Sequence, residues 1–147
     1  MNAEAIKTVL REATERELAF LREYSFAFTA VSEEYSEALK TWFTASLTNA
    51  VANRVVRVTY FPRKTGAREV AITDITRVEP ESREWDDYTS LGSMQVRVTD
   101  LTDERGDLAA RLTFHLHAAA RTLHDQFLPV LLGREWKSDH LDWGGLK

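Results

Sequence analysis

The sequence has no cysteine among its 147 residues. This absence excludes disulfide bonds, thiolate catalysis and cysteine-ligated zinc or iron–sulfur sites. It is typical of a reducing compartment, and we predict a cytoplasmic location. Glycine is also scarce, with six residues in the chain. There is no Walker loop, dinucleotide fingerprint or Gly-x-Ser-x-Gly elbow, so the sequence carries no known motif for nucleotide binding or for a nucleophilic serine.

Long apolar runs are missing as well. The longest aliphatic-rich run, Phe127 to Leu132, is far shorter than the ~20 residues that a membrane helix needs. The N-terminus has no basic segment followed by an apolar one, so we expect no secretory signal and no membrane partner. The formal net charge is -4, and a nucleic-acid partner is not expected because phosphate binding usually needs a basic face. The length predicts a single domain over residues 1–147.

The stretch from Glu33 to Val51 has the clearest helical pattern. Ser32 stands where an N-cap belongs, and acidic residues follow in the first turn, where the helix dipole favours them. Its predicted apolar face consists of Tyr35, Leu39, Trp42, Phe43, Ser46, Leu47 and Ala50. A similar stripe predicts an earlier helix over residues 3–24. Residues 24–31 fit either a helix or a strand, and we assign most of them to the earlier helix.

Four later segments alternate between apolar and polar residues, which is typical of strands. They are Arg54–Phe61, Arg68–Val78, Met94–Leu101 and Leu108–His117. The first two predict a hairpin with a bulge near Thr73-Asp74, and the last two predict a second hairpin. Ala118 to Leu128 has the pattern of a closing helix that Pro129 interrupts or ends.

The predicted fold class is therefore α+β: two N-terminal helices, a four-stranded antiparallel sheet from two hairpins, and a C-terminal helix, arranged as a two-layer sandwich. We expect Leu39, Trp42 and Phe43 to pack on the apolar face of the sheet, which includes Val98 and Phe114. In element order this resembles the cystatin-like (NTF2-like) architecture in outline, although the closing helix departs from that pattern.

Histidines are the candidates for metal or proton chemistry. On a strand, His115 and His117 would point the same way, with their Cα atoms ~7 Å apart. No sequence spacing supplies a third ligand, so we predict no metal site and no cofactor. Glu17 falls on the apolar stripe of the first helix, and we place it at the edge of that stripe. No catalytic residue is assigned.

The first predicted hairpin is rich in basic residues, and an acidic loop follows it. The basic residues are Arg54, Arg57, Arg63, Lys64, Arg68 and Arg77. One interpretation is a site for an anionic partner. The other is that the two segments neutralise each other or are simply solvated.

The acidic loop, residues 79–92, contains aromatic side chains beside clustered acids. Aromatic anchors within a charged rim are typical of a contact surface. We predict that Trp85, Asp86, Asp87 and Tyr88 contact a partner protein. The leading hypothesis is a non-enzymatic protein–protein interaction domain, such as an adaptor, a chaperone or an immunity-type neutralising protein.

An alternative hypothesis is a small-ligand-binding protein or a cofactor-independent enzyme of cystatin-like architecture. Its pocket would lie between the helices and the sheet, with His115 or His117 as the general base, because histidine titrates nearest neutral pH. Homodimerisation through a sheet edge or a helix face is compatible with both hypotheses. The lack of a catalytic motif favours the non-enzymatic one.

Overall fold

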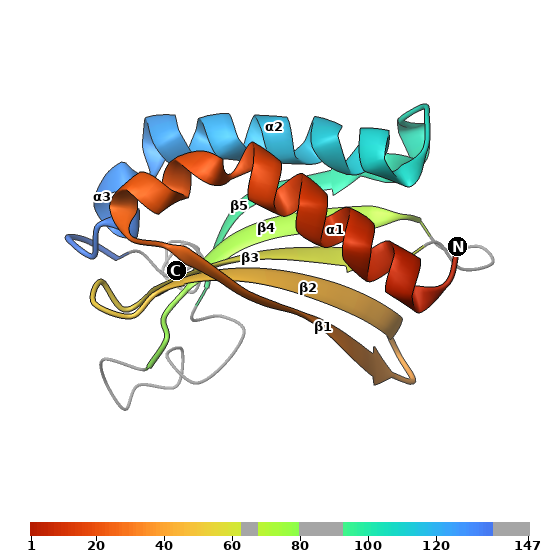
Figure 1. Ribbon diagram of the computed structural model, residues 1–147, viewed down its shortest axis with the longest axis horizontal. Helices are drawn as coiled ribbons and strands as arrows, with labels where there is room; N and C mark the ends of the chain where they lie inside the picture. Colours follow the sequence, from red (N-terminus) through yellow and green to blue (C-terminus); the bar gives the residue numbers. More distant parts are fainter. Residues whose placement is uncertain (63–67, 80–92, 137–147) are drawn as a thin grey trace, which may run out of the picture.

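In the computed structural model, the described residues are 1–62, 68–79 and 93–136. They form an α+β fold with a five-stranded antiparallel sheet. Two long helices, α1 (Ala3–Glu17) and α2 (Leu108–Gln126), lie side by side over one face of this sheet (Figure 1). The opposite face has no described helix over it. The predicted α+β class and antiparallel sheet are confirmed, but the number of strands and the N-terminal helices are not as predicted.

The first helix is close to the prediction. Asn2 caps α1, because its side chain accepts a hydrogen bond from the backbone N–H of Ala5 at 2.8 Å. A 3-10 helix, η1 (Ala19–Tyr24), continues the chain and places Leu21 in the core. Its end at Ser25 has a φ of 68°, which turns the chain into the first strand.

The predicted helix from Glu33 to Val51 is wrong. These residues belong to a hairpin of β1 (Ala27–Ser36) and β2 (Lys40–Asn49). The side chain of Ser36 accepts a hydrogen bond from the N–H of Leu39, and Lys40 takes a left-handed φ of 60°. The turn therefore forms without the glycine or asparagine that usually marks such a conformation. Tertiary pairing outweighs the helical pattern here.

The remaining strands are β3 (Arg54–Phe61), β4 (Val70–Thr76) and β5 (Met94–Asp100). All five strands pair in chain order as an antiparallel meander. The register shifts between Thr73 and Asp74 in the β4–β5 pair, which confirms the predicted bulge.

The predicted strand Leu108–His117 is also wrong, because these residues form the first half of α2. Asp107 accepts a hydrogen bond from the N–H of Ala110 at 2.8 Å and caps the helix. The buried side chains recur at helical spacing, not at every second position. They are Leu108, Leu112, His115, Leu116, Ala119 and Leu123. A short helix, α3 (Leu128–Leu131), follows.

The core fills the space between the helices and the sheet. Alternate residues of the central strands point toward the helices and are at most 4% exposed, among them Phe43, Val56, Val58, Tyr60 and Ile75. Helix residues such as Leu10, Leu112, Leu116 and Leu123 are fully buried against them. Trp136 near the C-terminus also packs against this core.

Candidate interaction surface

The sheet face turned away from the helices carries both apolar and polar side chains. Its residues alternate with the core residues along each strand, because successive side chains of a strand point to opposite faces. The pairing registers arrange them in rows across the sheet. We call this surface the open face.

Two rows of the open face are largely apolar or β-branched. One row joins Glu34, Trp42, Phe61, Val70 and Asp100. The next joins Ser32, Thr44, Thr59, Ile72 and Val98. The rings of Trp42 and Phe61 lie with centroids 6.3 Å apart, and Val98 is 53% exposed. No described helix lies over the apolar side chains of these two rows.

The third row carries an ion pair. The guanidinium of Arg57 donates to both carboxylate oxygens of Asp74, at 2.9 and 2.5 Å. Burial of the guanidinium opposes its charged form, but Asp74 outweighs burial and raises the pKa of Arg57. This pair satisfies two charges inside the open face, so neither is left for a partner of opposite sign.

The described basic residues of the predicted first hairpin contact other groups of the chain, whereas Arg63 and Lys64 lie outside the described residues. Arg68 pairs with Asp100 at 3.1 Å. Arg54 is 2% exposed and donates to the carbonyl oxygens of Asn53, Val130 and Glu135. The guanidinium carbons of Arg54 and Arg77 lie 4.9 and 4.4 Å from the centre of the Trp136 ring. These contacts occupy the described basic residues within the fold, and whether the acidic loop neutralises them stays a prediction because that loop lies outside the described residues.

The β1 edge of the sheet is less suited to binding than the open face. Its register shifts between Phe28 and Ala30, and its outer half carries Glu33 and Glu34. Bulges and charged side chains are the features with which natural sheets discourage pairing of an exposed edge.

The predicted contact residues Trp85, Asp86, Asp87 and Tyr88 lie outside the described residues. They belong to the segment between β4 and β5, the strands that carry Ile72 and Val98.

The two histidines of the alternative hypothesis do not face the same way. His115 is fully buried, and its ring nitrogens lie 2.8 Å from the Thr73 hydroxyl and 2.9 Å from the Thr99 hydroxyl. Burial, with a smaller effect of Arg97, lowers the pKa of His115 to about 4. His117 is exposed, with Nδ1 3.8 Å from Glu17. The two contacts of His115 join α2 to the sheet. Because His115 has no exposed surface and both of its ring nitrogens are engaged, its position does not support the role of a general base.

Glu17 lies at the edge of the helix packing, as predicted. Its carboxylate accepts a hydrogen bond from Arg16 at 3.0 Å, and its side chain is 18% exposed.

A second buried polar cluster joins α2 to the other end of the sheet. Glu69 accepts hydrogen bonds from Tyr60 at 2.5 Å and from two nitrogens of Arg111 at 2.8 and 3.0 Å. Burial and then the Glu69 carboxylate raise the pKa of Tyr60. All three groups are satisfied within the chain, so the cluster holds the two layers together.

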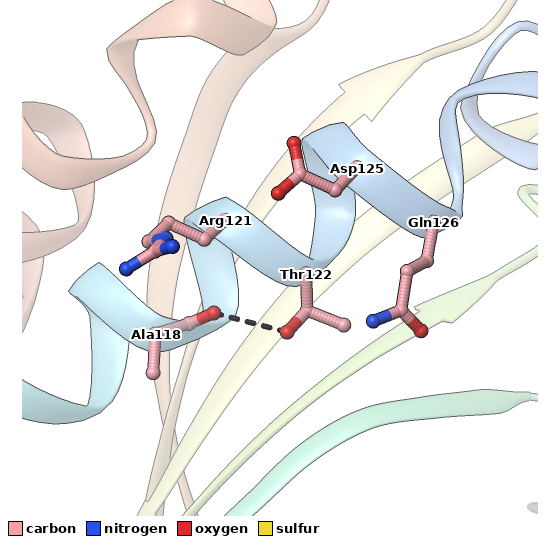
Figure 2. A pocket seen from close by; sticks show the side chains of 5 residues that line it. All are labelled: Ala118, Arg121, Thr122, Asp125 and Gln126. Atoms are coloured by element: carbon pink, nitrogen blue, oxygen red, sulfur yellow. Dashed lines mark hydrogen bonds between the residues drawn. The ribbon is translucent and has the colours of Figure 1, made fainter.

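One pocket of about 270 Å³ is lined by side chains of α2 alone (Figure 2). It is lined by Ala118, Arg121, Thr122, Asp125 and Gln126. The hydroxyl of Thr122 donates to the carbonyl of Ala118, so it is engaged within the helix. Typical ligand pockets hold ~300–1,000 Å³ and bury most of the ligand. This one is smaller and lies on the outside of the molecule, not between the layers.

Within residues 1–62, 68–79 and 93–136, no group of three or more histidine, aspartate or glutamate side chains could hold a metal ion. No helix of that part of the chain is long and apolar enough to cross a membrane. The chain matches no protein-family model, and comparison with curated proteins and with solved structures gives no significant match. Any functional assignment therefore depends on the geometry of the chain itself.

Proposed function

We propose that the chain is a non-enzymatic, cytoplasmic protein-binding domain that contacts its partner through the open face of the sheet. The observation that supports this proposal is the difference between the two sheet faces. Both long helices lie over one face, whereas the other carries Trp42, Phe61, Ile72 and the 53% exposed Val98. Exposed apolar surface bordered by polar side chains is typical of protein contact sites.

The size of the open face bears on the kind of contact. Five strands ~4.8 Å apart and four residue rows deep cover roughly 500 Å². A standard interface buries ~800 Å² on each partner. The open face alone therefore fits a transient contact, and a stable complex would need a neighbouring segment. The segment between β4 and β5 is the natural candidate in the sequence, so Trp85, Asp86, Asp87 and Tyr88 remain proposed contact residues.

Two exposed apolar residues provide a matched test. Val98 lies on the open face and Phe114 lies on α2, with exposed fractions of 53% and 48%. We expect Val98→Arg to abolish capture of the partner that the wild-type protein retains from its native host. Phe114→Arg should leave capture unchanged. Equal capture by all three proteins would contradict the proposal.

The segment between β4 and β5 is tested separately. Trp85→Ala combined with Asp87→Ala should weaken binding of the same partner, measured by isothermal titration calorimetry with purified proteins. Unchanged affinity would remove this segment from the contact surface. Analytical ultracentrifugation of the chain alone would show whether the partner is a second copy.

A further inference from the structure

Glu34 and Trp42 occupy facing positions on β1 and β2. Their Cα atoms are partners in the antiparallel register, so both side chains lie on the open face. Trp42 in turn contacts Phe61 on β3, with ring planes tilted by 30°. A carboxylate therefore stands at the margin of an aromatic pair.

The charge on Glu34 is distinctive because the acids around it have ion-pair partners. Glu33 pairs with Lys7 at 3.3 Å, and Glu37 pairs with Lys40 at 3.6 Å. On the open face itself, Asp74 pairs with Arg57. Among the described residues, no lysine, arginine or histidine forms an ion pair with Glu34. Glu34 helps to raise the pKa of Arg57, after burial and Asp74, but it makes no ion-pair contact with that residue.

The aromatic side of the site is also without a cation. In the described part of the chain, Trp136 has the guanidinium groups of Arg54 and Arg77 over its ring, but none lies over Trp42. An indole face and a carboxylate together favour a guanidinium, which stacks on the ring and donates paired hydrogen bonds to the oxygens. An ammonium would use the charge but not the planar stacking.

We propose that Glu34 and Trp42 bind an arginine side chain of the partner protein. This inference rests on the proposed function, because it names the chemistry that the open face recognises. Glu34 accepts hydrogen bonds from the guanidinium, while Trp42 supports its planar face. The contact is electrostatic in part, and it weakens as salt increases.

The test uses N-acetyl-arginine amide as the probe and N-acetyl-citrulline amide as its neutral, nearly isosteric control. Binding is followed by the indole N–H resonance of Trp42 in ¹H–¹⁵N spectra of the full chain, assigned with Trp42→Phe. We expect the arginine probe to shift this resonance and the citrulline probe to leave it in place. Equal shifts with both probes would overturn the proposal.

Two glutamate-to-glutamine substitutions test whether Glu34 itself, and not the negative charge near it, binds the arginine probe. Glu34→Gln should reduce the affinity for the arginine probe about threefold to tenfold, as expected for loss of one exposed charge contact. Glu33→Gln removes a neighbouring charge that pairs with Lys7, and it should leave the affinity unchanged. Equal affinity of wild type and Glu34→Gln would overturn the inference. The proposed function is judged separately, by the capture test with Val98→Arg. If Val98→Arg abolishes capture, the open face still binds the partner even when the arginine inference is wrong. If Val98→Arg leaves capture unchanged, the proposed function itself is wrong.

Discussion

His115 and Thr73 connect α2 to β4 through a buried contact of 2.8 Å between the ring Nε2 and the hydroxyl oxygen. The other ring nitrogen reaches Thr99 on β5. A neutral imidazole can donate to one hydroxyl and accept from the other, so both nitrogens are satisfied without charge. The imidazole of His115 thus links the two layers of the fold, and its buried position favours the neutral form.

Because the folded state favours neutral His115, we expect the free energy of unfolding to decrease as the pH falls. The pKa of His115 is about 4 in the folded protein, against about 6.5 in an unfolded chain. The unfolded state takes up the proton first, so the stabilisation is complete above about pH 6.5 and is lost as pH falls toward 4. The difference corresponds to about 3 kcal/mol.

Urea unfolding at pH 7 and at pH 4.5 would measure this loss. Other groups also titrate in this range, so the comparison is with His115→Gln, whose stability should change less between the two pH values. The exposed His117→Gln serves as the control and should behave like wild type. A wild-type pH dependence that His115→Gln fully retains would show that another group is responsible.

The cluster of Glu69, Tyr60 and Arg111 predicts a coupling between two charges. Arg111→Met removes the guanidinium that pairs with the Glu69 carboxylate, which is 7% exposed. We expect a loss of about 2–3 kcal/mol in the free energy of unfolding, below the range for fully buried pairs because Arg111 is partly exposed. Thermal and chemical unfolding would give this value.

The double variant Glu69→Gln with Arg111→Met tests the cause. Removing both charges should recover much of the stability lost in Arg111→Met, because the buried charge of Glu69 is removed together with its Arg111 partner. A double variant that loses the sum of the two single changes would mean that the charges act independently.

Two neighbouring aromatic residues on β2 are expected to differ in their contribution to stability. Phe43 is 2% exposed and faces the helices, so Phe43→Ala should cost ~3–5 kcal/mol as a core truncation. Trp42 is half-buried on the open face, so Trp42→Ala should cost less, roughly 1–2 kcal/mol. Chemical denaturation of both variants would reveal the difference. Equal losses would place Trp42 in the core.

This pair also shows why the sequence predicted part of the fold and missed the rest. Trp42 and Phe43 both suit one helical face, yet the alternation of apolar and polar residues from Phe43 to Thr48 also fits a strand. The turn before Lys40 contains no glycine, asparagine or proline, so the sequence has no turn signal that would predict a hairpin there. The segments around Pro62 and Gly66 had such signals, and their strands were predicted correctly.

The prediction of a strand over the first half of α2 was wrong because its sequence fits two patterns. Leu108, Leu112 and Leu116 satisfy both a period of two and a helical repeat, and Phe114 completed the strand pattern although it is 48% exposed. Alanines and the Asp107 cap favour the helix. The open face could not be predicted while β1 and β2 were assigned to a helix, because the pairing of Glu34 with Trp42 arises only in the sheet.

The central claim is that the open face binds the partner, and methyl resonances of the complex test it most directly. The purified partner would be added to the chain labelled at isoleucine and valine methyl groups. We predict that Ile72 and Val98 shift or broaden on binding while the buried Val130 of α3 does not change. Perturbations confined to α1 and α2, with Ile72 and Val98 unaffected, would contradict the account.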